Sequence, residues 1–500
     1  MPPSDAPPTP GQGFRPKARR PRGLEDRRGP ALARERAAIE AISKVYEKWG
    51  FEALETPALE YADALGKFLP DQDRPNEGVF AFADDDEQWL SLRYDLTAPL
   101  ARFVAENYDA LPKPYRRWAA GPVWRNEKPG PGRYRQFWQC DADTVGSASP
   151  AADAEMIAMA CEALEAAGVA PGRYRMRFSH RKLLDGLLAA VEIEPGREAE
   201  IRMRVLRAID KYDRLGIDGV GALLRQGRRD ESGDFTAGAG LTEVSAKLVE
   251  KFVTGVSGEP TEVLRTLTNL VGGTQQGDAA LNDIENIFEV LGSRVLIPHS
   301  CHIETSVVRG LEYYTGAVFE AELIAKGSDG KHVSFGSIGG GGRYDDLVAR
   351  FRGERVPATG FSIGVSRLVA ALEAAEGVEA ANGPVVILSL EADRMADYFA
   401  MAAELRNAGV RAEVYLGAGK FGPQLKYADK RNAPLAIIQG SNEREKSPPV
   451  VMIKDLKLGA EMSKSIADNE EWRKGRPAQI EAPRSDLVAT VKRMLAGKTK

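Results

Sequence analysis

Charged, amide and aromatic side chains are concentrated between positions 125 and 143, more densely than a strand pair that only fills a core would need. They are Arg125, Glu127, Lys128, Arg133, Arg135, Phe137, Gln139, Asp141 and Asp143. The Pro- and Gly-rich loop EKPGPG separates two stretches with strand character, 122–126 and 134–140, which predicts a long β-hairpin. Arginine can hold a phosphate through paired hydrogen bonds, and an aromatic ring such as Phe137 can stack on a purine. The hairpin is therefore the first candidate for a nucleotide site.

Two glycine clusters offer a second kind of phosphate site, because glycine lets the backbone approach a ligand closely. The chain has no GxxxxGK[ST] sequence, which excludes the P-loop class. Gly417, Gly419 and Gly422 form GxGxxG, but no acidic residue follows at the spacing of a dinucleotide site, which favours a turn that caps a helix. The run 339–342 either brings a ligand close to the backbone or makes a bulge or hairpin turn.

The sequence lacks metal-ligand and disulfide patterns. Its three cysteines and four histidines form no CxxC, HExxH or similar ligand spacing. They are Cys140, Cys161, Cys301, His180, His299, His302 and His332. The sequence therefore predicts neither a disulfide framework nor a structural zinc site.

The elements that position these side chains should belong to more than one domain, because 500 residues exceed what one core usually organises. Hydrophobic residues make up 43% of the chain and charged residues 28%, which is typical of a soluble globular protein. No apolar run approaches the length of a membrane-spanning helix, and the first residues do not resemble a signal peptide. We therefore expect a cytoplasmic protein with no membrane partner.

The character of the sequence changes along the chain. Residues 1–13 hold five prolines, which predicts a disordered tail. Helical periodicity over 30–49 predicts a helix, and Thr97 is a plausible cap for a second one. Helical stretches separated by glycine-rich turns fill 191–295, as expected of a helical insertion. From about 383 to 500, strands and helices alternate, which predicts a small α/β domain.

Charge is distributed unevenly along the chain. The 68 basic and 72 acidic residues give a net charge of −4, which does not by itself indicate a nucleic-acid partner. The segment 14–28, however, has seven basic and two acidic residues, and 420–464 has nine basic and five acidic residues. Such segments either contact phosphates or form solvated faces.

Three strings resemble the motifs of class II aminoacyl-tRNA synthetases. RNE from position 125 and RYRQF from position 133, with the loop between them, resemble motif 2. GFSIGVSRL, which contains Gly364 and ends in Arg367 and Leu368, is similar to motif 3. GFEALETP, with Pro57, resembles the motif 1 strand of their dimer interface.

Two further strings narrow this resemblance to histidyl-tRNA synthetases. VRGLEYYTG at 308–316 and GGGRYDDLV at 340–348 look like the signature pair of that family. RGLED near the start, LRYDLT and QCDAD fit the family in the same order. The resemblance covers nearly the whole chain except the tail and the inserted helical region.

The resemblance implies a fold and a function. The fold is an α+β catalytic domain over 14–378, in which helices flank an antiparallel sheet interrupted by the helical insertion 191–295. An α/β anticodon-binding domain over 383–500 follows, and the protein is a homodimer. The implied function is that of a histidine–tRNA ligase, which activates L-histidine with ATP to histidyl-adenylate and transfers it to the 3′ end of tRNA(His). Mg2+ would accompany the ATP, with no metal site of the protein's own.

The resemblance assigns ATP binding to Arg125, Glu127, Arg133, Phe137 and Arg367. Arg125 would hold the α-phosphate and the histidine carboxylate, and Phe137 would stack on adenine. The other two arginines would hold the outer phosphates. Arg309, a second catalytic residue opposite Arg125, would take the electrostatic role that a metal ion plays in related enzymes. From the residues alone, Arg309 could equally be a surface cation, and Glu127 could pair with Arg135.

The resemblance assigns histidine binding to Asp95, Leu96, Thr97, Arg125, Gln139, Asp143, Arg309, Tyr313 and Tyr314. Asp95, Thr97 and Gln139 would accept hydrogen bonds from the α-ammonium group. Asp143 would accept from one imidazole nitrogen, and a tyrosine hydroxyl would donate to the other. A strand would place the two tyrosines on opposite faces, in which case one of them belongs to the core.

The sequence departs from the family pattern at several of these positions. Asp95 and Asp143 stand where many bacterial relatives carry the longer Glu. Lys128 and Gly130 stand where typical bacterial enzymes read the acceptor end of the tRNA, so we expect weaker dependence on the extra 5′ guanosine of tRNA(His). Ser366 replaces a Glu that often precedes the motif 3 arginine.

Two other classes of protein are alternatives. A non-catalytic histidyl-tRNA synthetase-like regulatory subunit of ATP phosphoribosyltransferase shares the catalytic fold but usually lacks the C-terminal domain and catalytic residues. Here Arg125, Gln139, Arg309 and Arg367 are intact, and the region after 383 is present. A nucleotide-binding dehydrogenase built on GxGxxG is disfavoured, because no acidic residue follows this motif at the spacing of a dinucleotide site.

Overall fold

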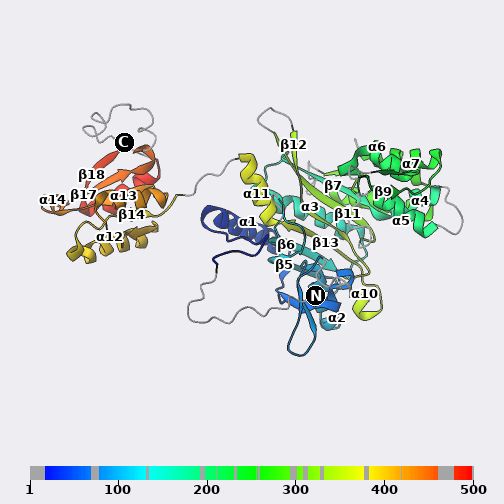
Figure 1. The fold of residues 1–500 in the computed structure, drawn as a ribbon, viewed down its shortest axis with the longest axis horizontal. Helices are drawn as coiled ribbons and strands as arrows, with labels where there is room; N and C mark the ends of the chain where they lie inside the picture. Colours follow the sequence, from blue (N-terminus) through cyan, green and yellow to red (C-terminus); the bar gives the residue numbers. More distant parts are fainter. Residues whose placement is uncertain are drawn as a thin grey trace. The chain divides into compact units, whose positions relative to one another are not determined.

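The structure is a computed structural model, and it divides into two compact units, Met1–Gly377 and Val378–Lys500 (Figure 1). The residues that it describes are 17–68, 78–130, 134–191, 198–209, 211–229, 233–254, 256, 260–292, 301–307, 314–326, 332–376, 382–417, 419–459 and 478–497. The predicted disordered tail, 1–13, lies outside these ranges. None of the helices among the described residues combines the length and the apolar character needed to cross a membrane.

The first unit combines helices with one large sheet. Its helices are α1 (Gly29–Lys48), α2 (Thr97–Asn107), α3 (Pro150–Ala166), α4 (Arg181–Ala190), α5 (Glu198–Ile209), α6 (Tyr212–Leu224), α7 (Glu243–Thr254), α8 (Pro260–Val271), α9 (Gln275–Leu291), α10 (Ala349–Arg352) and α11 (Val365–Glu376). Its strands are β1 (Glu52–Ala53), β2 (Leu59–Tyr61), β3 (Ala81–Ala83), β4 (Trp89–Leu92), β5 (Tyr115–Trp124), β6 (Gln136–Val145), β7 (Tyr174–His180), β8 (Gly227–Arg229), β9 (Phe235–Ala237), β10 (Cys301–Ile303), β11 (Ala317–Lys326), β12 (His332–Arg343) and β13 (Ala358–Gly364).

Eight of these strands form the large sheet, in the order β1-β5-β6-β13-β12-β11-β7-β10. The outermost strands, β1 and β10, run parallel to their neighbours, and the pairs between them are antiparallel. A largely antiparallel sheet with helices packed on it confirms the predicted α+β class of this unit.

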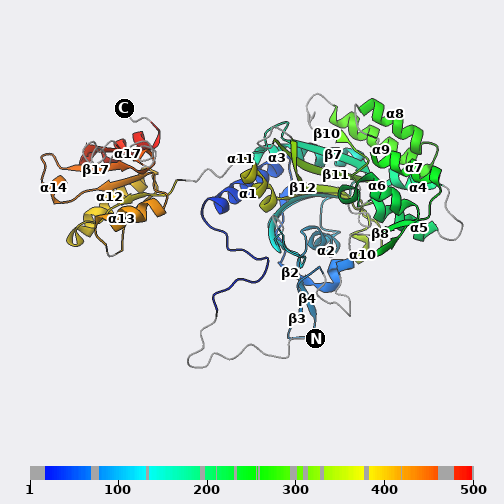
Figure 2. The same cartoon turned by 45° about the horizontal axis from the view of Figure 1, so that its top comes forward.

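Most helices of this unit pack on one face of the large sheet, and α2 packs on part of the other face. Helices α1, α3 and α11 lie on the same side of the strands (Figure 2), and their side chains, with those of α4 and α9, form one buried core with the strands. Cys140 and Ala142 of β6 belong to this core. Successive residues of a strand point to opposite faces, so Gln139, Asp141 and Asp143 point away from this core. These polar residues therefore lie on the face opposite this core, the face on which α2 packs.

Several predicted elements agree with the structure, and others differ from it. Helix α1 confirms the helix predicted over 30–49. The hairpin is present, but its strands extend well beyond the predicted 122–126 and 134–140, because YRRWAAG before position 122 also pairs with β6. Between 191 and 295 the described residues form α5 to α9 and a short hairpin of β8 with β9, which the helical periodicity did not indicate.

A second, small sheet lies beside the large one. Its strands have the order β2-β4-β3, and a 3-10 helix, Ala62–Phe68, follows β2. Tyr61 lies opposite Leu90, and Phe82 also lies opposite Leu90, so these three side chains share one face. Tyr61 and Phe82 are exposed.

The second unit is a five-stranded sheet between two helical layers. Its strands are β14 (Val385–Ile387), β15 (Ala412–Val414), β16 (Leu435–Ile438), β17 (Val450–Asp455) and β18 (Gln479–Pro483), and its helices are α12 (Met395–Asn407), α13 (Phe421–Lys430), α14 (Ser441–Arg444) and α17 (Leu487–Leu495), with 3-10 turns Ala392–Arg394 and Arg484–Asp486. The order is β15-β14-β16-β17-β18. Helices α12 and α17 pack in one core and α13 in another, which confirms the predicted α/β architecture.

Candidate active site

The β5–β6 hairpin brings the predicted phosphate-binding residues to one end of the large sheet. In its register Val123 lies opposite Phe137. Just beyond the paired strands, the N–H of Arg125 donates to the carbonyl of Arg135 over 2.9 Å. The pairing therefore continues to the loop, whose Arg133 lies outside the described residues.

Arg125 is held between two aromatic rings. Its guanidinium carbon lies 4.4 Å from the centre of the Tyr94 ring and 5.1 Å from the centre of the Phe137 ring. Its Nε donates to the backbone oxygen of Tyr94 over 3.4 Å. Cation–π contacts orient a guanidinium while leaving its charge in place. Arg125 is therefore suited to bind a phosphate or a carboxylate.

Glu127 is bonded to the same tyrosine. The Tyr94 hydroxyl donates to Oε1 of Glu127 over 3.0 Å. Burial raises the pKa of Tyr94 to about 12, and Glu127 adds to this rise while Arg125 opposes it, so the hydroxyl remains a donor at neutral pH. Arg135 donates through Nε to the backbone oxygen of Glu127 over 2.9 Å. Arg135 therefore contacts the backbone of Glu127, and the carboxylate binds Tyr94, in contrast to the alternative of an ion pair between Glu127 and Arg135.

A row of polar residues on β6 lies on the face of the sheet opposite the main helical core. Gln139, Asp141 and Asp143 alternate along the strand, and all three are buried. Nε2 of Gln139 donates to Oγ of Ser362 over 2.7 Å, whereas its Oε1 has no hydrogen-bond partner among the described residues. A buried amide oxygen without a donor is costly unless a ligand supplies one. Gln139 is therefore a candidate acceptor for a bound ammonium group.

Asp141 was not among the predicted binding residues, although it lies in the middle of this row. It accepts a hydrogen bond from the Ser362 hydroxyl. Burial raises the pKa of Asp141 to about 7, with Arg117 opposing the shift and Asp143 adding to it. The two-residue spacing from Gln139 is the signal that could have identified Asp141 from the sequence.

Asp143 is part of a buried ion pair. Nη2 of Arg117, a residue that is 0% exposed, lies 2.8 Å from Oδ2 of Asp143. The Tyr344 hydroxyl donates to Oδ1 of Asp143. Burial raises the pKa of Asp143 even though Arg117 acts to lower it. A Cβ on Gly360 would lie 1.9 Å from Oδ1, so only glycine leaves room for this carboxylate.

The three residues Asp95, Leu96 and Thr97 lie at the start of α2. Oδ1 of Asp95 accepts hydrogen bonds from the N–H groups of Thr97 (3.1 Å) and Ala98 (2.9 Å). The prediction that Thr97 caps the helix is therefore wrong; the carboxylate of Asp95 binds the first unpaired N–H groups instead. The Leu96 carbonyl accepts from Nη2 of Arg117 over 2.9 Å, so this guanidinium joins the start of α2 to β6.

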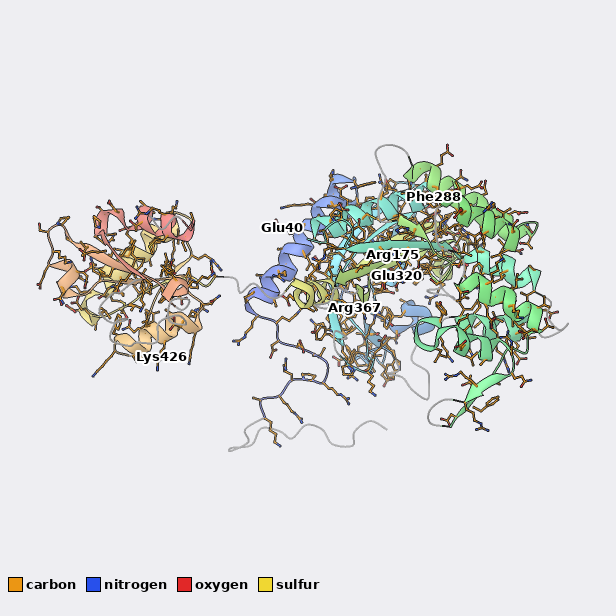
Figure 3. The ribbon with its side chains drawn as sticks, turned by 90° about the horizontal axis from the view of Figure 1, so that it is seen from above. Glu40, Arg175, Phe288, Glu320, Arg367 and Lys426 are labelled. Atoms are coloured by element: carbon orange, nitrogen blue, oxygen red, sulfur yellow. The ribbon has the colours of Figure 1, made fainter. Side chains whose placement is uncertain are left out.

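Arg367 lies in the first turn of α11, beside the strands of the sheet (Figure 3). Its Nη1 donates to the carbonyl of Ser337 over 3.0 Å. The preceding Ser366 accepts a hydrogen bond from the N–H of Trp138 over 3.0 Å. The helix that carries Arg367 is therefore bonded directly to β6, the strand of Phe137.

Tyr314 is the half-buried member of the predicted tyrosine pair, and it packs against the core beside α2. A Cβ on Gly342 would lie 2.8 Å from its ring, so this glycine makes room for the tyrosine. The run 339–342 lies inside β12 and pairs with strands on both sides, so it is not a hairpin turn. The site residues that lie outside the described ranges are Arg133, Arg309 and Tyr313.

The described residues thus place a guanidinium held by rings beside a row of buried polar groups. Such an arrangement can position an anion and an amino acid, and stabilise charge that develops between them. Among these residues, no three His, Cys, Asp or Glu side chains form a group that could hold a metal ion.

Comparison with known proteins gives two family matches. Residues 23–368 match the family described as histidyl-tRNA synthetase, and residues 384–492 match the anticodon binding domain. The two matches fall in the two compact units of the structure.

Individual relatives align over nearly the whole chain. The histidine–tRNA ligase of Caulobacter vibrioides is 55% identical over 98% of this chain and 99% of its own. That of Cereibacter sphaeroides is 53% identical over 96% of this chain and 98% of its own. Among solved structures, the histidyl-tRNA synthetase of Nostoc sp. PCC 7120 superposes with a TM-score of 0.72 at 26% identity, covering 96% of this chain and 100% of that one.

Proposed function

Because the chain belongs to the histidyl-tRNA synthetase family, we propose that the polar row of β6 and Arg125 beside it form its active site. The chain is an aminoacyl-tRNA ligase, which uses ATP and takes histidine and tRNA as its other substrates. The regulatory-subunit alternative is not favoured, since the full-length relatives are ligases. The observation that carries the site assignment is the buried Oε1 of Gln139, which has no partner among the described residues and lies two positions along β6 from Phe137, the ring that contacts Arg125.

In the first step, a carboxylate oxygen of histidine attacks the α-phosphorus of ATP, and pyrophosphate leaves. Negative charge builds up on the phosphate oxygens, so fixed cations aimed at them are the main contribution a protein can make. We assign the α-phosphate and the histidine carboxylate to Arg125, whose plane the two rings fix. Arg309 is assigned to the opposite side, and Arg133 and Arg367 to the outer phosphates.

Adenine and the amino acid use different groups. Phe137 is assigned to stack on adenine beside Glu127. The α-ammonium group of L-histidine is assigned to Gln139, Asp95 and Thr97. A pocket that satisfies a substrate through buried hydrogen bonds rejects analogues without them by about 10⁴- to 10⁵-fold, so no editing activity is needed.

The imidazole ring is assigned to Asp143 together with Tyr313 or Tyr314. Arg117 and Tyr344 already bind the carboxylate of Asp143, which fixes its orientation. The carboxylate of Asp143, shorter than the Glu of many relatives, is thus held in a fixed orientation in which it can accept a hydrogen bond from the imidazole. Leu96 belongs to the same pocket, because its carbonyl is bonded to Arg117.

In the second step, a hydroxyl of the terminal ribose of tRNA(His) attacks the carbonyl carbon of histidyl-adenylate, and AMP leaves. Mg2+ would enter with ATP and neutralise its phosphates, since this ion usually binds substrate phosphates and few protein carboxylates. We assign no protein ligand to it.

We propose a homodimer formed through the small sheet β2-β4-β3. Leu59, Tyr61 and Phe82 are 39%, 57% and 47% exposed and lie on the same face of this sheet. Contiguous exposed apolar side chains of this size usually mark a protein interface. We also propose a cytoplasmic location, and a division into a catalytic domain over 14–378 with the insertion 191–295 and an anticodon-binding domain over 383–500.

Histidine-dependent exchange between ATP and pyrophosphate tests this assignment. We expect exchange with histidine and with no other amino acid, and its loss in Arg125→Ala and Arg309→Ala. Exchange supported by a different amino acid would refute the substrate. Undiminished exchange in either variant would refute that arginine's catalytic role.

A further inference from the structure

A basic segment, residues 17–28, precedes α1 and is anchored to the hairpin. The N–H of Arg135 donates to the carbonyl of Gly23 over 2.8 Å. Gly23 lies in a turn with a φ of +79°, and a Cβ on it would lie 2.9 Å from Cγ and Cδ of Arg135. Since Arg125 is bonded to the other backbone group of Arg135, the segment lies two hydrogen bonds from the proposed catalytic arginine.

The segment is anchored at a second point near its end. Nη1 of Arg27 binds the carboxylate of Glu35 on α1 and donates to Oγ of Ser366 over 3.2 Å. Ser366 lies in the first turn of α11, directly before Arg367. The basic segment is therefore bonded to both the hairpin and α11, the two elements that carry the proposed nucleotide-binding residues.

The other basic side chains of this segment point into solvent. The segment contains six basic residues and two acidic ones, Glu25 and Asp26. Arg27 is the basic residue paired with Glu35. The remaining basic residues, all exposed, are Lys17, Arg19, Arg20, Arg22 and Arg28. The result is a concentrated positive surface on a protein whose net charge is −4.

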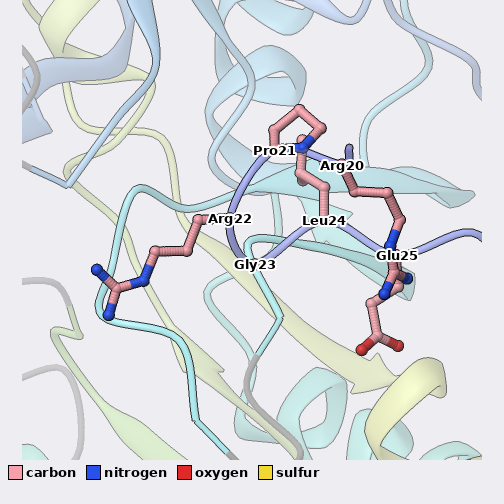
Figure 4. Close-up of a pocket in the computed structure, with 6 residues that line it drawn as sticks. All are labelled: Arg20, Pro21, Arg22, Gly23, Leu24 and Glu25. Carbon is pink, nitrogen blue, oxygen red and sulfur yellow. The ribbon is translucent and has the colours of Figure 1, made fainter. Parts of the chain in front are cut away.

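The turn in the middle of the segment borders an open hollow of about 350 Å³, lined by residues 20–25. Arg22 extends from one side of this turn and Arg20 from the other (Figure 4). Two guanidinium groups that diverge from one turn can bind separate phosphates of an extended polyanion.

We infer that segment 17–28 binds backbone phosphates at the acceptor end of the tRNA. This inference rests on the proposed function, in which the 3′ end of the tRNA must reach the histidyl group beside Arg125. The segment is bonded to Arg135 at one end of the hairpin loop, and Arg125 stands at the other end of the same loop. Arginines that bind phosphate oxygens contribute affinity without reading bases.

Phosphate oxygens are also presented by ATP, so the test must separate the two sources. The variant is Arg20→Ala/Arg22→Ala, and the matched control is Arg36→Ala, which removes an exposed arginine of α1 outside the segment. ATP–pyrophosphate exchange requires no tRNA, whereas aminoacylation does. Both reactions are measured on the full chain over a range of salt concentrations.

We expect the KM for tRNA to rise about 5- to 20-fold in the double variant. The slope of log(kcat/KM) for tRNA against log salt should become shallower by about 0.7 to 0.9 for each RNA phosphate that the variant no longer neutralises. Exchange should stay within twofold of the wild type, which also shows that the variant is folded. Arg20→Lys/Arg22→Lys should retain most of the affinity for tRNA. Binding to backbone phosphates requires positive charge, which lysine keeps, more than the paired hydrogen bonds of a guanidinium group.

Three results would overturn the inference. The first is an unchanged KM for tRNA. The second is an equal rise of the KM for tRNA in the Arg36→Ala control, which would show that the effect depends on the net charge of the protein and not on this segment. The third is a raised KM for ATP in exchange, which would assign these arginines to the nucleotide. A wild type that shows no histidine-dependent exchange would instead refute the proposed function.

Discussion

The hydroxyl of Ser366 donates a hydrogen bond of 2.5 Å to Oε2 of Glu35, which lies 331 positions earlier in the chain. Glu35 is buried on α1, and Ser366 also accepts the N–H of Trp138 on β6. One hydroxyl thus joins α1, β6 and α11. Position 366 lacks the Glu that often precedes the motif 3 arginine. Glu35 of α1 instead places a carboxylate beside this position.

Ser366→Ala should affect both stability and ATP binding. The change leaves the N–H of Trp138 and the carboxylate of Glu35 without this partner, and an unpaired buried group costs about 1 to 3 kcal/mol. We expect the free energy of unfolding in urea to fall by about 2 kcal/mol. Because Arg367 follows Ser366 in α11, we also expect the KM for ATP in exchange to rise several-fold.

Ser43→Ala is the matched control, because Ser43 is a buried serine on the same helix as Glu35. Its hydroxyl donates to the carbonyl of Ile39 one turn earlier, over 2.8 Å, and joins no second element. We expect the free energy of unfolding to fall by less than about 1 kcal/mol and the KM for ATP to stay unchanged. Equal effects of the two substitutions would show that the hydrogen bonds of Ser366 to α1 and β6 contribute no special stability.

Asp143→Ala should destabilise the protein far more than the loss of an ordinary surface charge. Arg117 and Asp143 are 0% and 2% exposed, so the substitution leaves a buried guanidinium without its counter-charge. Breaking a buried pair in this way typically costs about 3 to 5 kcal/mol. Asp346→Ala breaks the exposed pair with Arg355 and should cost about 0 to 1 kcal/mol. Urea unfolding of both variants distinguishes these outcomes.

The pH dependence of stability should change in Asp141→Asn. Burial raises the pKa of Asp141 to about 7, above the 3.8 of a free side chain. Between these two values the folded chain holds a proton that the unfolded chain has released, so this group lowers the free energy of unfolding as pH rises. The stability of Asp141→Asn relative to the wild type should therefore increase from pH 4 to pH 7, by about 1 kcal/mol per unit. A difference that stays constant across urea titrations at pH 5, 6, 7 and 8 would show that Asp141 is ionised throughout.

The proposed dimer face predicts that Tyr61→Glu yields a monomer. A charge on an apolar face that becomes buried in the assembly costs several kcal/mol when it has no partner. Sedimentation should show the mass of one chain for this variant and of two chains for the wild type. Phe235→Glu alters an aromatic residue of similar exposure, 58%, on β9, and should leave the dimer intact. A wild type that sediments as one chain would refute the dimer.

Local features of the site could be predicted from the sequence because they depend on residues close together in the chain. The hairpin follows from its Pro- and Gly-rich loop, and α1 follows from its periodicity. The resemblance of QCDAD to the family points to Gln139 and Asp143, and their alternation along β6 places them together on the face opposite the main helical core. The structure adds Asp141, which obeys the same alternation.

Features that depend on strand register or on distant elements could not be predicted in this way. Arg117 lies opposite Asp143 because of the register in which β5 pairs with β6. The local sequence around either residue does not determine that register. Glu35 reaches Ser366 only because α1 packs against α11. Thr97 was a reasonable cap by residue type, but Asp95 two positions earlier presents its carboxylate to the same N–H groups.

Gln139→Met tests the histidine pocket directly. Methionine keeps the length of the side chain but provides only a weak acceptor, and Oε1 of Gln139 has no other partner among the described residues. A hydrogen bond to a charged group contributes about 1.5 to 3 kcal/mol, so the KM for histidine should rise about 10- to 100-fold while the KM for ATP changes little. Gln439→Met removes another buried glutamine, one that donates to Val450 in the second unit, and should leave both constants unchanged. An unaltered KM for histidine in Gln139→Met would mean that the α-ammonium group binds elsewhere, with Asp141 as the nearest remaining acceptor on the row.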